Sequence, residues 1–150
     1  MTKYDYTVAV VGCGRISQGA HFPGFAKLGN VRVKYACDLI PEKAQAMKDK
    51  YDFVENVITD YKIALADPEV TAVFVFTPNY AHYTVSMDAL RAGKHVLCEK
   101  PITINYALSK EMADEAVSVR SRKTGDMGVM YAADFIEFAN KQIEEKVLDN

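Results

Sequence analysis

The chain has 150 residues, with 18 lysines and arginines against 20 aspartates and glutamates, so its formal net charge is -2. This length is typical of one domain, and the interspersed charges argue against nucleic acid or an anionic membrane as a partner. No apolar run reaches the ~18 residues of a membrane span, and residues 1–6 lack the regions of a signal peptide, so we expect a cytoplasmic chain.

Strand and helix patterns alternate along the chain. Apolar, β-branched runs predict strands at 6–11, 31–38, 57–59, 72–76 and 95–98. Helical spacing of apolar residues predicts helices at 16–28, 41–51, 61–66, 80–92 and 105–122. Pro23 is expected to break or kink the first helix, whereas Asp60 and Gly93 are expected to cap helices. The alternation predicts an α/β fold, a Rossmann-type, doubly wound and mainly parallel sheet with right-handed crossovers.

The last part of the chain departs from this alternation. Residues 123–126 are typical of a turn, and residues 127–131 occupy the place of a sixth strand. Apolar residues recur at helical spacing from 132 to 148. We therefore expect a dinucleotide-binding core at 1–122 and a C-terminal extension at 123–150, which packs on the core or on a second copy.

A glycine-rich turn follows the first strand and consists of Gly12, Cys13, Gly14, Arg15 and Ile16. Gly12 permits a tight turn, and Gly14 allows a pyrophosphate to approach the main chain. The helix that follows offers free N–H groups to the same anion. Ser17 stands where a small residue keeps helix and strand close. The pattern predicts a dinucleotide site, with an ordinary structural turn as the alternative.

Asp38 ends the second strand, at the spacing from the glycine turn where an acidic side chain can accept hydrogen bonds from the ribose hydroxyls. The same carboxylate would repel a 2′-phosphate, so the sequence favours NAD over NADP. The alternative is that Asp38 caps the helix beginning at Pro41.

Two further strand ends carry polar residues. Residues 77–79 (Thr-Pro-Asn) follow the fourth strand, and His82 lies in the first turn of the next helix. Glu99 and Lys100 follow the fifth strand. Because ligands bind beyond the carboxyl ends of parallel strands, these residues are candidates for a site. The alternatives are ordinary capping at 77–79, a histidine with a structural role at position 82, and a surface ion pair between Glu99 and Lys100.

The three cysteines, Cys13, Cys37 and Cys98, lie in or at the end of apolar runs. We interpret them as small buried hydrophobic residues rather than metal ligands or nucleophiles, and we expect no metal site.

Four sequence blocks closely resemble the N-terminal half of the Gfo/Idh/MocA oxidoreductases, the family of glucose-fructose oxidoreductase and inositol dehydrogenase. The blocks are residues 12–16 (Gly-Cys-Gly-Arg-Ile), 36–38 (Ala-Cys-Asp), 77–83 (Thr-Pro-Asn-Tyr-Ala-His-Tyr) and 92–101 (Ala-Gly-Lys-His-Val-Leu-Cys-Glu-Lys-Pro). The last block is the most specific, and the blocks keep the family's order and spacing. The resemblance implies a nicotinamide-dependent dehydrogenase acting on a hydroxyl of a sugar, a sugar nucleotide or a cyclitol.

The resemblance also assigns roles to individual residues. Lys100 matches the family's lysine that contacts the reacting hydroxyl and assists its proton transfer, and it is the expected catalytic residue. Pro101 stands where family members often have a cis peptide. The expected cofactor-binding residues are Gly12, Cys13, Gly14, Arg15, Ile16, Asp38, Thr77, Pro78, Asn79, His82, Glu99 and Lys100.

Members of this family continue into a substrate-binding α+β domain, whereas the present sequence stops at Asn150. Positioning of reactants supplies about 7 to 11 kcal/mol of catalysis, and loss of half of it lowers the rate roughly 10²- to 10⁴-fold. We therefore expect cofactor binding with little or no turnover, unless a homo-oligomer or another chain supplies the missing surface. The alternatives are a non-catalytic NAD-responsive module that regulates or completes another protein, and a structural remnant that binds nothing.

Overall fold

The computed structural model describes residues 6–115, 117–121 and 125–130. These residues belong to two compact parts, one ending at Ile104 and the other beginning at Asn105. Within the described ranges, no helix has both the length and the apolar character needed to cross a bilayer.

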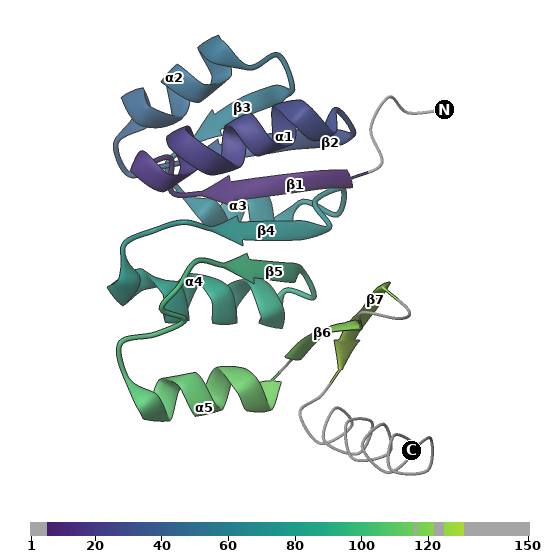
Figure 1. Ribbon diagram of the computed structural model, residues 1–150. Helices are drawn as coiled ribbons and strands as arrows, with labels where there is room; N and C mark the ends of the chain where they lie inside the picture. The colour runs from purple at the N-terminus through teal and green to yellow at the C-terminus, as the bar shows by residue number, and fades with distance from the viewer. Residues whose placement is uncertain (1–5, 116, 122–124, 131–150) are drawn as a thin grey trace. The chain divides into compact units, whose positions relative to one another are not determined.

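The first part is built on a five-stranded sheet with the strand order β3-β2-β1-β4-β5 (Figure 1). Its strands are β1 (Tyr6–Val11), β2 (Val31–Cys37), β3 (Val54–Ile58), β4 (Ala72–Val75) and β5 (His95–Cys98). All neighbouring pairs are parallel. The order reverses direction at β1 and β4, and in sheets of this type ligands bind at the carboxyl ends of the strands beside such a reversal.

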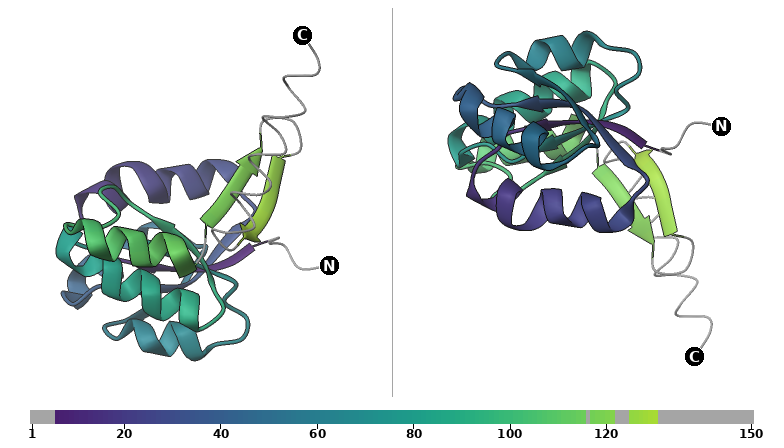
Figure 2. Two further views of the ribbon diagram at one scale, coloured as in Figure 1. Left: turned by 90° about the horizontal axis from the view of Figure 1, so that it is seen from below. Right: turned by 90° about the horizontal axis from the view of Figure 1, so that it is seen from above.

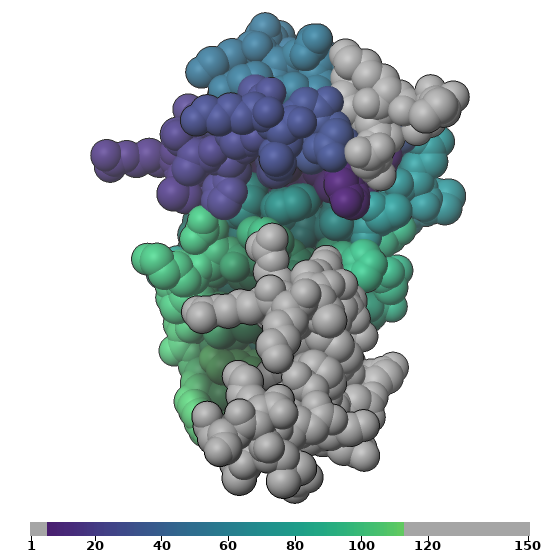
Figure 3. All heavy atoms as spheres, turned by 45° about the vertical axis from the view of Figure 1, so that its right-hand side comes forward, coloured from purple at the N-terminus to yellow at the C-terminus, as the bar shows by residue number. Residues whose placement is uncertain are grey.

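Helices cover both faces of this sheet. They are η1 (Ser17–His21), α1 (Phe22–Leu28), α2 (Pro41–Lys50), α3 (Tyr61–Ala66) and α4 (Asn79–Arg91). Residues of α1 and α2 share the core beneath one face, and residues of α3 and α4 share the core beneath the other. Figure 2 shows α1 and α4 on opposite sides of the sheet. In the space-filling view, α2 lies above α1 on the surface of the molecule (Figure 3). The doubly wound architecture predicted from the sequence is thus confirmed.

Each face of the sheet has its own hydrophobic core, and β1 contributes alternate residues to the two cores. Val8 and Val10 belong to the core beneath α1 and α2, which includes Phe22. Ala9 and Val11 belong to the core beneath α3 and α4. Burial on both faces explains why residues 8–11 of β1 are an uninterrupted apolar run rather than an alternating one.

Most predicted elements of the first part are confirmed within one residue at each end. The third strand differs, because it begins at Val54 rather than at residue 57, with Val54 paired to Val33 of β2. Asp60 caps α3 by accepting a hydrogen bond from the Lys62 N–H, and Gly93 follows α4 with a φ of 71°. Both capping predictions are therefore confirmed.

The first helical segment does not break at Pro23, but its hydrogen-bond pattern changes from π-helical to α-helical just before this residue. The π-helical turn η1 leads directly into α1, with Pro23 in the first turn of α1. The Phe22 N–H donates to the Ser17 carbonyl in the wider π pattern. A proline has no N–H and crowds the carbonyl four residues before it, and the π turn relieves this crowding without ending the helix.

The second part contains α5 (Tyr106–Glu115), β6 (Val117–Ser121) and β7 (Gly125–Met130). The prediction of a helix over 105–122 is wrong after residue 115, since β6 pairs antiparallel with β7. The strand predicted at 127–131 is confirmed through residue 130 as part of β7, but it pairs with β6 in a separate sheet rather than as a sixth strand of the main sheet. Gly125 and Asp126, which we predicted in a turn, lie in β7. The predicted helix at 132–148 lies outside the described residues.

Candidate functional site at the carboxyl ends of the strands

The chain leaves β1 through Gly12, which has a φ of 98°. A Cβ atom at this position would lie 2.5 Å from both the carbonyl carbon and oxygen of Phe76 and 2.7 Å from the Thr77 nitrogen. The Gly12 N–H donates to the Cys37 carbonyl at 2.8 Å. Gly12 therefore lies between the ends of β2 and β4, and the fold itself requires a glycine here.

Gly14 has no such internal requirement. A Cβ atom there would have no neighbour within 4 Å, and its φ is not positive. The first hydrogen bond of the following helix runs from the Gln18 N–H to the Gly14 carbonyl at 3.0 Å. The amides of Gly14, Arg15 and Ile16 therefore precede the helical ladder, and the space that a Gly14 side chain would occupy is open.

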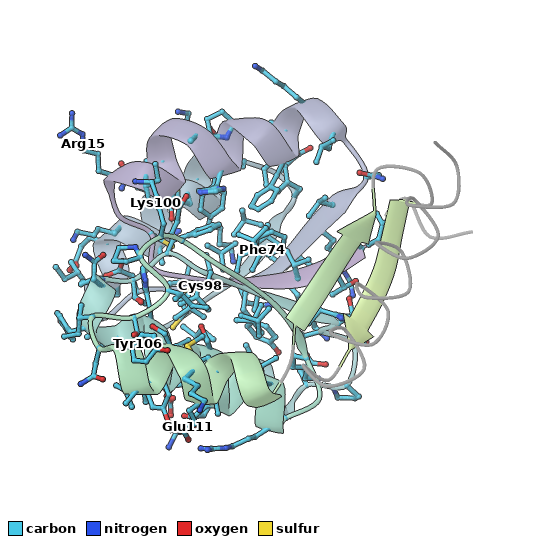
Figure 4. The ribbon with its side chains drawn as sticks, turned by 60° about the horizontal axis from the view of Figure 1, so that its bottom comes forward. Arg15, Phe74, Cys98, Lys100, Tyr106 and Glu111 are labelled. Carbon is cyan, nitrogen blue, oxygen red and sulfur yellow. The ribbon has the colours of Figure 1, made fainter. Side chains whose placement is uncertain are left out.

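Ser17 is fully buried under this turn, and its hydroxyl donates to the Gly12 carbonyl. The side chain of Arg15 is exposed and extends away from the molecule (Figure 4). The small Ser17 thus fastens the helix to the turn on the inside, while Arg15 faces solvent on the outside.

Asp38 connects the end of β2 with the glycine turn. One carboxylate oxygen accepts the Cys13 main-chain N–H at 2.8 Å, and the other accepts the Ile40 N–H at 2.9 Å. The Asp38 carboxylate thus faces the glycine turn, whereas the alternative that it caps the helix beginning at Pro41 is not borne out, because α2 begins without a side-chain capping hydrogen bond. A carboxylate has about four acceptor positions, so two remain for other donors.

Thr77 and Pro78 lie in the turn between β4 and α4, and Asn79 is the first residue of α4. Pro78 and Asn79 are exposed, whereas the Thr77 hydroxyl is buried and has no hydrogen-bond partner among the residues that the structure describes. His82 is only 1% exposed, and its two ring nitrogens lie 2.8 Å from the Thr77 carbonyl and 2.7 Å from the Pro101 carbonyl. His82 therefore joins this turn to the segment after β5.

Glu99 pairs with a histidine from the other side of the site. The His21 Nε2 lies 2.7 Å from a Glu99 carboxylate oxygen, and the His21 ring stacks on Phe76 with centroids 3.7 Å apart. The hydrogen bond from His21 lowers the pKa of Glu99 below its usual range. The second Glu99 oxygen accepts the Lys100 main-chain N–H at 3.2 Å.

Lys100 lies between Glu99, which contacts His21, and Pro101, which contacts His82. The Lys100 side chain is exposed (Figure 4). The carboxylate of Glu99 is bound by His21, so it contacts Lys100 through the main chain rather than in the simple surface ion pair considered from the sequence. The Lys100-Pro101 peptide bond is cis, as the family resemblance implied.

Sequence reasoning did not assign any role to His21. It lies four residues after Ser17, so the two residues share one side of a helix, and Ser17 was already recognised as an inward-facing position. The four-residue spacing from Ser17 was the sequence signal that could have indicated an inward-facing His21. The partner, Glu99, is 78 residues away along the chain, and only the folded sheet brings the two together.

Two cysteines lie at the site but are not reactive groups. Burial, followed by the nearby Asp38 carboxylate, raises the pKa of Cys13 to about 12. Burial is also the main reason why the pKa of Cys37 is raised to about 12. Both are protonated thiols at neutral pH and are poor nucleophiles and metal ligands in that form.

A family model described as an oxidoreductase family with an NAD-binding Rossmann fold, the Gfo/Idh/MocA family, matches residues 6–124. The chain belongs to this oxidoreductase family. Within it, residues 6–124 are the NAD-binding Rossmann domain. The glycine turn, Asp38 and Lys100 all lie inside the matched range.

Proteins similar to this chain are longer dehydrogenases and reductases. The inositol 2-dehydrogenase/D-chiro-inositol 3-dehydrogenase of Lactiplantibacillus plantarum is 32% identical over 94% of this chain and 40% of its own length. A levoglucosan dehydrogenase in complex with NADH and L-sorbose superimposes with a TM-score of 0.68 and 28% identity, covering 74% of this chain and 31% of that one. The chain thus spans about 40% of the curated relative.

A third similar protein was solved with a different cofactor. It is a 3-ketoreductase from Actinomadura kijaniata in complex with NADP and TDP-benzene, with a TM-score of 0.65, 27% identity, and coverage of 71% of this chain and 32% of that one. These relatives leave the choice between NAD and NADP to the residues of this chain.

Proposed function

We propose that these 150 residues are the cofactor-binding part of an oxidoreductase that acts on a hydroxyl of a sugar, a sugar nucleotide or a cyclitol, and that they prefer NAD(H) to NADP(H). The observation that carries the proposal is the pairing of a carboxylate with the glycine turn, since Asp38 accepts the Cys13 N–H at 2.8 Å. The open space at Gly14 supports the same proposal.

The glycine turn fits the diphosphate of a dinucleotide. The amides of Gly14, Arg15 and Ile16 precede the helical ladder and are available to phosphate oxygens. A side chain at position 14 would occupy the open space without improving any internal contact. The residues at this turn therefore fit the group that the family binds.

Asp38 supports a preference for NAD(H). Its two remaining acceptor positions suit the two ribose hydroxyls, whereas a 2′-phosphate would meet a carboxylate. The next residues, Leu39 and Ile40, are exposed hydrophobic side chains and offer no positive charge to that phosphate. Hydrogen bonds to a charged group contribute roughly 1.5 to 3 kcal/mol, so the preference should be about 10- to 100-fold.

The residues proposed to face the nicotinamide and the substrate follow β4 and β5. Thr77 lies shortly after β4, Asn79 is the first residue of α4, and Lys100 lies shortly after β5. The bound nicotinamide supplies hydride transfer. The exposed Lys100 Nζ would exchange a proton with the reacting hydroxyl, while Glu99 holds the main chain beneath it.

We propose little turnover by these 150 residues alone, because they span only about 40% of the length of the curated relative. Sugar-dependent reduction of NAD, followed by absorbance, tests this part of the proposal. A rate that approaches that of a complete sugar dehydrogenase would overturn it.

Calorimetric titration of the purified chain with NADH and NADPH in parallel tests the cofactor assignment. We expect both to bind, NADH more tightly by about 10- to 100-fold. Equal or reversed affinities would refute the role given to Asp38. An absence of heat with either cofactor would refute the dinucleotide site.

A further inference from the structure

Two histidines from distant parts of the chain contact the residues on either side of Lys100. The His21 Nε2 lies 2.7 Å from the carboxylate of Glu99, the residue before Lys100. The His82 Nδ1 lies 2.7 Å from the carbonyl of Pro101, the residue after it. Lys100 itself is exposed and lies between the two contacts.

His82 is placed to hold the main chain rather than to contact a ligand. Its ring is buried, and both nitrogens are directed at main-chain carbonyls, one of Thr77 and one of Pro101. A carbonyl oxygen only accepts hydrogen bonds, so a ring N–H donates to the carbonyl that it faces, and a neutral imidazole has one N–H for these two contacts. Both nitrogens face main-chain carbonyls, so neither is directed at a cofactor.

His21 holds the other side of Lys100 through Glu99. Its ring lies flat on Phe76 at an interplanar angle of 13°, which fixes the direction of Nε2. One Glu99 oxygen accepts from His21 and the other accepts the Lys100 N–H. The contact therefore passes from η1, through one carboxylate, to the main chain of Lys100.

We propose that His21 and His82 are a pair of positioning residues for Lys100, each fixing one of its neighbours while the lysine side chain remains free to reach a substrate. A proton-transferring group must be held in a narrow range of positions to act, and main-chain contacts on both sides provide this. The proposal rests on the proposed function for the role of Lys100. The two hydrogen bonds themselves can be tested without cofactor.

The test uses opposite pairs of substitutions in the full chain. The amide nitrogen of asparagine falls close to the position of a histidine Nδ1, and that of glutamine falls close to Nε2. His82→Asn should therefore keep the bond to Pro101, whereas His82→Gln should lose it. His21→Gln should keep the bond to Glu99, whereas His21→Asn should lose it.

Amide hydrogen exchange at Glu99 and Lys100, followed by NMR without cofactor, is the readout. Loss of one hydrogen bond should speed this exchange about tenfold in His82→Gln and His21→Asn, with little change in His82→Asn and His21→Gln. A general loss of stability would not make glutamine the more disruptive substitution at position 82 and asparagine the more disruptive one at position 21. The same order at both sites, or unchanged exchange in all four variants, would overturn the proposal.

His95 provides the matched control, because it is an exposed histidine on β5 outside the site. His95→Asn and His95→Gln should leave the exchange at Glu99 and Lys100 unchanged. The unmodified chain offers a second measurement should a His82 variant fail to fold. Its imidazole spectrum should show a solvent-protected proton on the His82 Nδ1, and a bare Nδ1 would overturn the role of His82.

Titration with NADH separates this proposal from the proposed function. Reversed asparagine and glutamine effects in a chain that binds no NADH would support the two histidine contacts and refute the cofactor site. Tight NADH binding, with amide exchange unchanged in all four histidine variants, would support the cofactor site and refute the two histidine contacts.

Discussion

The carboxylate of Asp38 accepts the main-chain N–H of Cys13 at 2.8 Å, so the acid at the end of β2 and the turn after β1 form one structural unit. Neither residue is placed independently of the other. Any change at Asp38 should therefore affect both the proposed ribose contact and the shape of the glycine turn.

Asp38→Asn should weaken NADH binding by about 10- to 100-fold and shift the ratio of affinities toward NADPH. The physical reason is the loss of a negative charge that accepts from ribose hydroxyls and repels a 2′-phosphate. Parallel calorimetric titrations measure both affinities. Asp60→Asn is the matched control, because Asp60 also follows a strand and accepts a main-chain N–H, that of Lys62, but it follows the edge strand β3. A similar shift in both variants would contradict the prediction.

The two glycines of the turn should respond differently to alanine. Gly12→Ala should destabilise the fold by about 2 to 5 kcal/mol, because the new Cβ would overlap the main chain at Phe76 and because the φ of 98° is unfavourable for alanine. Urea unfolding measures this change. An unchanged free energy of unfolding would show that Gly12 does not lie so close to the main chain after β4.

Gly14→Ala should leave the free energy of unfolding within about 1 kcal/mol of the parent value, since a Cβ there has no neighbour within 4 Å. NADH binding should nevertheless weaken by at least about tenfold, because the methyl group would occupy space proposed for the diphosphate. Unchanged NADH affinity would place the diphosphate elsewhere.

Ser17 should tolerate alanine better than valine. Ser17→Ala removes the hydroxyl that donates to the Gly12 carbonyl and should cost about 1 kcal/mol. Ser17→Val adds volume at a fully buried position and should cost about 1 to 3 kcal/mol through overpacking. Unfolding curves in urea compare the two. A more stable valine variant would mean that the helix can move away from β1.

Acid stability should depend on Asp67, which accepts hydrogen bonds from the Lys34 ammonium at 2.6 Å and from the Tyr35 hydroxyl and Glu69 N–H, both at 2.9 Å. The Lys34 contact is the main reason why the pKa of Asp67 is lowered from 3.8 to about 2. A carboxyl whose pKa is lower in the folded state stabilises the fold above its unfolded pKa and loses this effect as the pH falls toward its folded pKa. The stabilisation should therefore disappear between about pH 4 and pH 2.

Thermal unfolding from pH 6 to pH 2 measures this dependence. Asp67→Asn should show a flatter decline than the parent chain below pH 4, together with lower stability at pH 6. Asp52→Asn serves as the control, because Asp52 is an exposed acid between α2 and β3. Identical pH profiles for Asp67→Asn and the parent chain would contradict the assignment.

The order of elements in the first part could be read from local sequence patterns. Strands such as β1 and β4 are short apolar runs, and Gly29 and Asp60 end or begin helices through contacts within a few residues. The same patterns failed beyond residue 115, because Val119 fits both the helical spacing that begins at Leu108 and the strand alternation of Val117 and Val119. Pairing of β6 with β7 decided between them, and a periodicity cannot show this pairing.

The sequence by itself determined the fold class, the glycine turn and the acid that follows β2, since each depends on residue type at a fixed spacing. It also contained the three residues from Glu99 to Pro101, but not what holds them. Only the tertiary structure brought His21 to Glu99 and His82 to Pro101, across 78 and 19 residues of chain. The physical reason is that parallel strands collect their carboxyl ends at one edge of a sheet, where side chains distant in sequence come within hydrogen-bonding distance.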